Sequence, residues 1–136
     1  MFSTLLTAGS AAAAPGSPDI LAVTPVPASG QVSCYGYFGT FKAGTDVVVI
    51  GWDSSSNECF GIATDRTIWH TWPNSGGWRR MGGNGHADEI AWPWFTEDPA
   101  TGWRQAAVYA ASNDSIWCQD YYPTSDWTGI WYRCDQ

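Results

Sequence analysis

The chain has 136 residues, with 6 Lys and Arg against 13 Asp and Glu, which gives a formal net charge of −7. This length allows at most one ordinary domain. Because binding to nucleic acid depends on neutralising phosphates, the acidic balance argues against a nucleic-acid partner. Ten Trp and six Tyr exceed what a core of this size needs, and both residue types suit half-exposed sites. The aromatic surplus is the strongest compositional indication of a binding function.

The first residues have the composition of an export signal followed by a linker. Leu5, Leu6 and the Ala run 11–14 lead into a small-residue cleavage site, so residues 1–14 are predicted to be a secretion signal of an extracellular protein. The alternative is an Ala-rich tail. Residues 15–30 contain four Pro among Ser, Ala and Gly, which predicts an extended linker or arm before a β domain at 31–136. No other segment approaches the ~20 apolar residues of a membrane span.

The four cysteines, an even number in an apparently exported chain, indicate two disulfides. The sequence alone leaves three pairings open. Cys118 and Cys134 fall on predicted strands joined by one hairpin, which favours a bridge between them. Cys34 with Cys59 then follows by elimination and would tie the first strand to the central segment. A zinc site is disfavoured because no Cys-x-x-Cys motif occurs.

The segment 59–83 has the clearest strand pattern, and much of it recurs later in the chain. In TIWHTW, Trp69 falls on one face of an extended chain and His70 on the other. Turn-forming residues then precede a second extended run, which predicts a hairpin. The recurring segments are Val47–Trp52 with Glu89–Trp94, Thr67–Trp69 with Ser115–Trp117, and Ser75–Met81 with Thr128–Cys134. They predict two copies of a four-stranded unit, at about 46–88 and 89–135.

The repeated motif is similar to that of a known family. A strand ending in Trp, an aromatic strand, Thr-Asp, Ile-Trp-His-x-Trp and Gly-Trp-x-x-x-Gly-Gly together resemble the blade repeat of the tectonin-like β-propeller lectins of bacteria, in particular the Photorhabdus lectin type. The first repeat carries Trp52, Phe60, Thr64, Asp65, Ile68, Trp69, His70, Trp72, Trp78, Gly82 and Gly83. The second keeps Trp94, Tyr109, Asp114, Ile116, Trp117 and Trp131. It departs from the motif at Cys118 and Asp120, which stand where the first repeat has His70 and Trp72.

The resemblance implies an all-β fold of two four-stranded antiparallel blade-like units of a β-propeller. Two blades cannot close a propeller, so we expect homo-oligomerisation to complete it, as a ring or as an open filament. The alternative is a monomeric β-sandwich.

The resemblance also implies glycan partners, with sugars bound in clefts between blades and no cofactor. A Trp ring covers the C–H face of a pyranose while neighbouring polar groups satisfy its hydroxyls. The residues expected to bind ligand are Trp69, His70, Trp72, Trp78 and Arg79 in the first repeat and Trp117 and Trp131 in the second. Because only the first repeat keeps His70 and Trp72, we expect the Trp69 site to bind and the Trp117 site mainly to pack.

Other interpretations of these residues compete with sugar binding. Each Trp is equally well explained as a core residue between sheets, and His70 as a hydrogen-bonded structural histidine. The loop residues His86, Asp88 and Glu89 could hold a metal or catalyse hydrolysis, but the chain has only two His and no Ser nucleophile motif. We therefore predict no enzymatic activity and no metal site. A secreted structural or self-assembling protein is the main alternative to a lectin.

Overall fold

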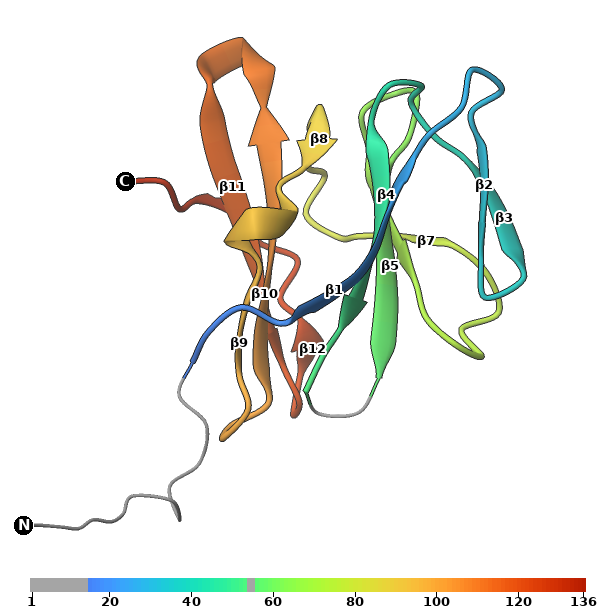
Figure 1. Cartoon of the computed structure of the whole chain (residues 1–136). Helices are drawn as coiled ribbons and strands as arrows, with labels where there is room; N and C mark the ends of the chain where they lie inside the picture. The colour runs from blue at the N-terminus through green and yellow to red at the C-terminus, as the bar shows by residue number, and fades with distance from the viewer. Residues whose placement is uncertain (1–14, 54–55) are drawn as a thin grey trace, which may run out of the picture.

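The computed structural model describes residues 15–53 and 56–136, and this part of the chain is all-β with no α-helix. Figure 1 shows curled antiparallel sheets that form a half-barrel. This confirms the all-β antiparallel class expected from the sequence. The predicted secretion signal, residues 1–14, lies outside the described residues.

The strands are short and follow one another with few interruptions. In chain order they are β1 (Asp19–Pro25), β2 (Gln31–Cys34), β3 (Tyr37–Thr40), β4 (Asp46–Gly51), β5 (Asn57–Ile62), β6 (Ile68–Thr71), β7 (Arg79–Arg80), β8 (Glu89–Ile90), β9 (Thr96–Asp98), β10 (Trp103–Ala110), β11 (Ser115–Tyr122), β12 (Asp126–Trp127) and β13 (Tyr132–Arg133). Two single-turn 3-10 helices, η2 (Trp92–Trp94) and η3 (Ala111–Asn113), lie between strands of the second half. Neither is long and apolar enough to cross a membrane, nor is any other helix among the described residues.

The strands form two main sheets and a separate hairpin. Sheet 1 has the order β1-β4-β5-β6-β7. Sheet 2 has the order β12-β11-β10-β8, with β9 also paired to β10 and β13 to β11. The β2–β3 hairpin is a sheet of its own. In Figure 1 the β10–β11 pair and the β4–β5 pair stand side by side with β8 between them, and the hairpin lies beyond sheet 1.

Sheet 1 is covered on both faces, as its apolar sequence requires. On one face, Ile50, Phe60 and Ile62 are fully buried in the main core, which they share with Val108 of sheet 2. On the other face, Val47 belongs to a smaller core that includes residues of the β2–β3 hairpin and its flanks. The fold is therefore a row of three layers, with sheet 1 in the middle.

The two main sheets repeat one strand order, in which β4-β5-β6-β7 corresponds to β8-β10-β11-β13. The registers of the last two strands correspond as well, because Trp69 lies opposite Arg80 and Trp117 lies opposite Arg133. The second unit contains longer connections, and these carry the additional strands β9 and β12.

The segment expected to be a linker instead contributes β1, which pairs antiparallel with β4 from Asp19 opposite Gly51 to Pro25 opposite Asp46. Its Ile, Val and Thr residues favour strand, and proline is tolerated at the end of an edge strand. The next residue, Val26, is buried, and its N–H donates to the Thr45 carbonyl at 2.8 Å. The ordered domain therefore begins before Gln31. The proline content predicted a linker here, but the free edge of sheet 1 allows this segment to pair as a strand.

Both predicted disulfides are present, and the described residues contain no free cysteine. Cys34–Cys59 joins the end of β2 to β5, so it ties the hairpin to sheet 1. Cys118–Cys134 joins β11 to the residue after β13. It secures the last strand, which has only two paired residues.

We predict that replacing Cys118 and Cys134 together with Ser lowers the free energy of unfolding by about 3 kcal/mol, the value for a closed loop of this size. Urea unfolding of the two proteins measures the difference. As a control on disulfide formation, alkylation of the unfolded, unreduced protein should label no cysteine, and labelling after reduction should reach all four. A labelled cysteine without reduction would contradict the presence of two disulfides.

Candidate functional site

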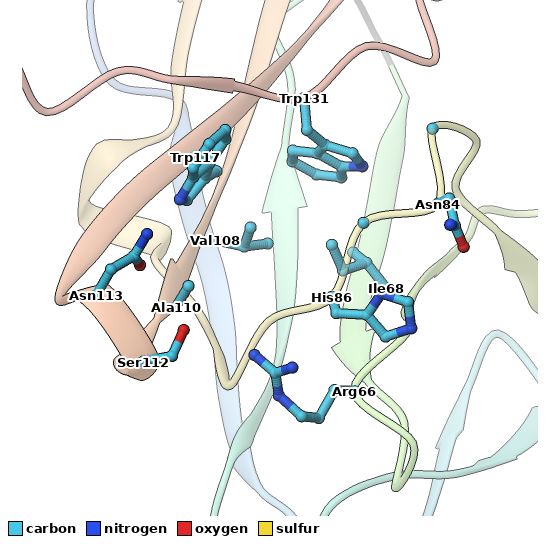
Figure 2. A pocket seen from close by; sticks show the side chains of 12 residues that line it. Arg66, Ile68, Asn84, His86, Val108, Ala110, Ser112, Asn113, Trp117 and Trp131 are labelled. Atoms are coloured by element: carbon cyan, nitrogen blue, oxygen red, sulfur yellow. The ribbon is translucent and has the colours of Figure 1, made fainter.

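A cavity of about 350 Å³ opens between sheet 1 and sheet 2, and we call it the inter-sheet pocket. Its aromatic lining consists of Trp117 and Trp131. Its polar lining consists of Arg66, Asn84, His86, Ser112 and Asn113, and its aliphatic lining of Ile68, Val108 and Ala110. Figure 2 shows the two indole rings at one end of the pocket and the Arg66 side chain toward the other. The pocket thus combines flat apolar surface with several hydrogen-bonding groups.

Trp117 is held in place by hydrogen bonds to the turn that precedes its strand. Its Nε1–H donates to Ser115 Oγ at 2.7 Å, and Ser115 Oγ donates to Asn113 Oδ1 at 2.5 Å. Since Ser115 is fully buried, this chain of hydrogen bonds fixes the orientation of the Trp117 indole ring. The ring therefore presents a preorganised surface to the pocket.

The first repeat contains the same chain of hydrogen bonds. Trp69 Nε1–H donates to Thr67 Oγ1 at 2.7 Å, and Thr67 Oγ1 donates to Asp65 Oδ1 at 2.5 Å. The Thr67 hydroxyl and the Thr67 N–H, which donates to the same oxygen at 3.1 Å, hold the pKa of the Asp65 carboxyl below its ordinary value. Asn113 thus takes the position of Asp65, although the sequence motif aligns Asp65 with Asp114. Asp114 instead has a left-handed backbone and accepts a hydrogen bond from the Tyr109 hydroxyl.

Trp131 is positioned by the glycine-rich loop 82–85. A Cβ atom at Gly85 would lie 2.6 Å from Cδ1 and Nε1 of Trp131, so only glycine allows the loop to approach the ring this closely. The Trp131 Nε1–H is buried and has no hydrogen-bond partner among the described residues. Gly83 of the motif is also close to this ring, since a Cβ atom there would lie 3.0 Å from Trp131 Cδ1, whereas Gly85 lies outside the motif.

Arg66 is oriented by Asp88, which lies outside the pocket lining. Arg66 Nε and one terminal nitrogen donate to the two Asp88 oxygens at 2.8 and 3.2 Å. Asp88 also accepts from the Ala111 N–H at 2.8 Å and from Lys42 Nζ at 3.4 Å. The Arg66 guanidinium, the Ala111 N–H and Lys42 hold the pKa of the Asp88 carboxyl far below its ordinary value of 3.8.

A second pocket, of about 260 Å³, lies at the corresponding place between sheet 1 and the hairpin. It contains Trp69 and Trp78, which the structure brings together as it does Trp117 and Trp131. Its remaining lining is Phe38, Gly39, Thr40, Phe41 and Ala63, with no charged side chain. Trp78 packs edge-on against Phe41, with ring centroids 4.6 Å apart. This pocket therefore offers apolar surface but few groups for hydroxyls.

The other residues expected at the Trp69 site lie elsewhere. His70 and Trp72 point to the opposite face of β6, with their ring centroids 5.1 Å apart. Arg79 is exposed, lies 5.8 Å from the Trp72 ring centre and donates to the Ser75 carbonyl at 2.6 Å. The predicted set of five residues is thus divided between the two faces of sheet 1.

His70 belongs to a buried polar cluster that the sequence does not indicate. Its Nδ1 lies 2.7 Å from Glu58 Oε2, and Trp52 Nε1–H donates to Glu58 Oε1 at 3.0 Å. Arg104 of sheet 2 lies 3.6 Å from the same carboxylate and 4.6 Å from the Tyr121 ring centre. Charges buried this deeply are found paired, so the cluster serves to join the two sheets. The nearest sequence signal is the alternation of β5, which places Glu58 on the same face as Phe60.

The loop residues considered for catalysis or metal binding do not converge. Asp88 forms ion pairs with Arg66 and Lys42. Glu89 is exposed and lies opposite Tyr109 of β10, whereas His86 lines the inter-sheet pocket. Across residues 15–53 and 56–136, no three His, Cys, Asp or Glu side chains are grouped so as to hold a metal ion. His86 remains available to a ligand in the pocket.

Comparison of the chain with protein-family models, with curated proteins and with solved structures found no match.

We predict that Asp88→Asn lowers the free energy of unfolding, and that this loss depends on pH. A carboxyl whose pKa is lower in the folded than in the unfolded chain stabilises the fold above the unfolded pKa, and this stabilisation disappears as pH falls toward the folded pKa. For Asp88 the loss begins as pH falls below about 4 to 5. The difference between variant and wild type should therefore be full near neutral pH and shrink in acid.

Urea unfolding at about pH 6 and about pH 3 measures this difference. The control is Glu89→Gln, because Glu89 is exposed and forms no ion pair among the described residues. A difference for Asp88→Asn that stays constant between the two pH values would show that the ion pairs do not stabilise the fold.

Proposed function

We propose that the protein is a secreted carbohydrate-binding protein and that the inter-sheet pocket is its sugar site. The observation that supports this most directly is the arrangement of Trp117 and Trp131 at one end of a cavity with Arg66, His86 and Asn113 around the remainder. A volume of about 350 Å³ falls in the range of small-molecule sites. The two disulfides are compatible with an extracellular location.

A pyranose ring complements these groups because it is amphipathic. Its axial C–H groups form an apolar face that gains free energy when an indole ring removes it from water. Its hydroxyls need donors and acceptors at the rim of the same pocket, and amide, imidazole and guanidinium groups supply them. Both indole rings are fixed before binding, Trp117 by Ser115 and Trp131 by the glycine loop, which lowers the entropy cost of association.

We propose the reverse of the order expected from the motif for the two Trp sites, and the lining of the two pockets supports it. The Trp69 pocket lacks the charged and amide side chains that surround Trp117. His70, which favoured the first repeat in the sequence, is paired with Glu58 on the other face of β6. We therefore assign the sugar to the second repeat and the packing role to Trp69, which contacts the smaller core.

We predict that Trp117→Ala lowers the affinity for the best glycan on an array by at least about tenfold, because stacked aromatic surface is worth about 1 to 3 kcal/mol. The matched control is Trp69→Ala, which removes an indole held by the same hydrogen bonds in the other repeat. Titration calorimetry with the free sugar measures both, and near-UV circular dichroism checks that each variant is folded. Loss of affinity in Trp69→Ala alone would transfer the site to the first repeat, and an array without any binding would contradict the lectin proposal.

A second candidate function, self-assembly, is favoured by the outer face of sheet 2. Ile62 and Ile68 of sheet 1 lie opposite each other and are buried beneath sheet 2. The corresponding pair in sheet 2, Tyr109 and Ile116, faces away from sheet 1 and is only half-buried. Together with Trp92 and Trp94 these residues line an open groove of about 450 Å³. The outer face of sheet 2 is therefore uncovered, although the equivalent face of sheet 1 is covered by the next unit.

We propose that a second copy of the chain occupies this groove, head to tail, with its β2–β3 hairpin. The hairpin is the opposite end of the row of layers, and its Phe38 is 73% exposed. Repetition of one contact would generate a ring if the rotation closes and a filament if it does not, as expected for propeller blades supplied by several chains.

We predict that light scattering at micromolar concentration finds assemblies larger than the monomer and that Trp94→Lys or Phe38→Lys reduces them to monomers. A charge buried in an apolar contact is costly, whereas the same change on an uninvolved surface is not. Leu21→Lys is the control, because Leu21 is 51% exposed on β1 and belongs to neither end of the row. A wild-type monomer would contradict self-assembly and favour the sandwich interpretation.

A further inference from the structure

The inter-sheet pocket has a charge opposite to that of the protein as a whole. The chain carries a net charge of −7, yet no Asp or Glu lines the pocket. Its ionisable side chains are Arg66 and His86. The lining therefore offers no carboxylate to pair with a cationic ligand, whereas Arg66 can pair with an anionic one.

The ion pair to Asp88 does not cancel this positive charge. Asp88 is shared between two cations, Arg66 at 2.8 Å and Lys42 at 3.4 Å, and also accepts the Ala111 N–H. One carboxylate therefore balances two positive side chains. The pKa of Asp88 is held far below its ordinary range, so this balance is the same at any physiological pH.

Arg66 retains donors for a ligand. It uses Nε and one terminal nitrogen for Asp88, and its other terminal nitrogen has no hydrogen-bond partner in the described part of the chain. Because the guanidinium is planar and clamped on one edge, its free edge has a fixed direction. Figure 2 shows this side chain extending toward the Ala110 and Ser112 side of the pocket. Asp88 thus acts as a positioning residue for Arg66.

The carboxylates elsewhere on the protein do not outweigh this local arrangement in solution. At physiological ionic strength the Debye length is about 8 Å, so exposed charges farther away than this are largely screened. The Arg66 side chain is 39% exposed, so solvent screens part of its charge, but a hydrogen bond between ions is stronger than one between neutral groups.

From these observations we propose that the ligand of the inter-sheet pocket is a carboxylated sugar. It is a pyranose with a carboxylate attached to C5, and its C–H face is covered by Trp117 and Trp131. Arg66 binds the carboxylate, and the indole rings bind the C–H face. The proposal rests on the proposed carbohydrate-binding function and narrows it to uronic-acid-type glycans.

The test uses methyl glycosides that differ only in the group on C5. The methyl glucuronide, galacturonide and mannuronide are compared by titration calorimetry with the corresponding methyl glucoside, galactoside and mannoside, at about 0.15 M salt. For the preferred epimer we expect the uronide to bind at least about tenfold more tightly than the neutral sugar, as a charge-assisted hydrogen bond implies. Arg66→Gln should lower the affinity for the uronide much more than the affinity for the neutral glycoside, so that this preference disappears.

Arg79→Gln is the matched control, because it makes the same change of charge at an exposed arginine that lies beside Trp72 and outside the pocket. It should leave the preference for the uronide intact. Asp88→Asn should weaken the preference less than Arg66→Gln does, since it releases the guanidinium without removing it. Equal affinity for uronide and neutral sugar, or a preference that survives Arg66→Gln, would overturn the proposal and leave the lectin function standing. Absence of binding to all six glycosides and to a glycan array would overturn both.

Discussion

The alternation of side chains along β6 and β11 is the constraint on which the rest of the structure depends. In each strand, the Trp faces one neighbouring layer and the Ile before it faces the other, because successive residues of a strand point to opposite sides of the sheet. Trp69 therefore contacts the hairpin and Ile68 faces sheet 2, while Trp117 faces sheet 1 and Ile116 lies half-buried in the outer groove of sheet 2. Stacking of layers, the two Trp pockets and the uncovered end all follow from this single pattern.

The space between the two main sheets contains a buried polar cluster at one end and the inter-sheet pocket at the other. At one end, the Glu58 carboxylate receives Trp52, His70 and Arg104, so charges from both sheets are neutralised where they are buried. At the other end, the sheets are separated by loops, and glycines keep one loop thin enough for Trp131 to remain at the wall of a cavity. A site of this kind needs a rigid support, and the core with its buried cluster provides it.

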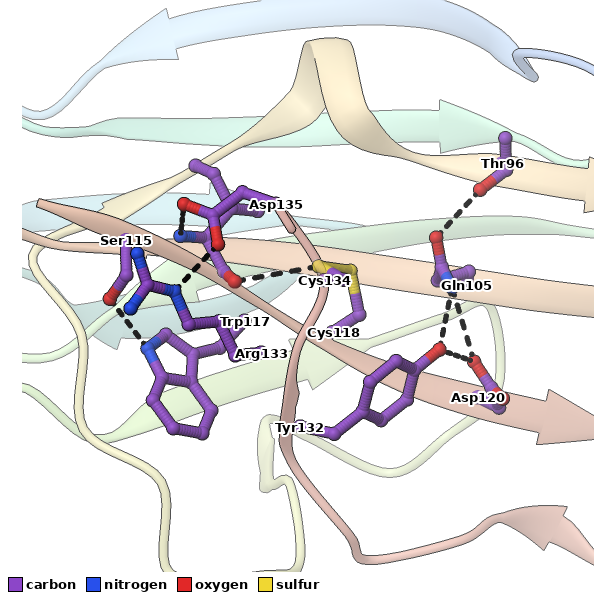
Figure 3. Close-up of a disulfide and its surroundings, with 11 residues drawn as sticks. Thr96, Gln105, Ser115, Trp117, Cys118, Asp120, Tyr132, Arg133, Cys134 and Asp135 are labelled. Carbon is purple, nitrogen blue, oxygen red and sulfur yellow. Dashed lines mark hydrogen bonds and ion pairs between the residues drawn. A yellow bond between two sulfur atoms is a disulfide. The ribbon is translucent and has the colours of Figure 1, made fainter.

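The outer face of sheet 2 shows how the second repeat has adapted to being the last layer. Figure 3 shows the Cys118–Cys134 disulfide there, with the Tyr132 hydroxyl bonded to Asp120 at 2.7 Å and to the Gln105 amide at 2.7 Å. Partial burial raises the pKa of Tyr132 to about 12, and Asp120 adds to the shift. Where the first repeat has His70 and Trp72 beneath a covering sheet, the second has a disulfide and polar groups that tolerate water.

The sequence by itself determined the all-β class and the presence of two disulfides, and it favoured their observed pairing, because alternation, turn residues and cysteine positions are local signals. It also named Trp117 and Trp131 in the second unit, but in the first unit it grouped Trp69 and Trp78 with His70, Trp72 and Arg79, which do not line the same pocket. The tertiary structure decided which polar side chains accompany each pair. The side chains of Arg66, Asn84 and His86, from loops of the first repeat, line the same pocket as Trp117. Glu58 of sheet 1 lies next to Arg104 of sheet 2. Such contacts join residues far apart in the chain, and only the packing of two sheets brings them together.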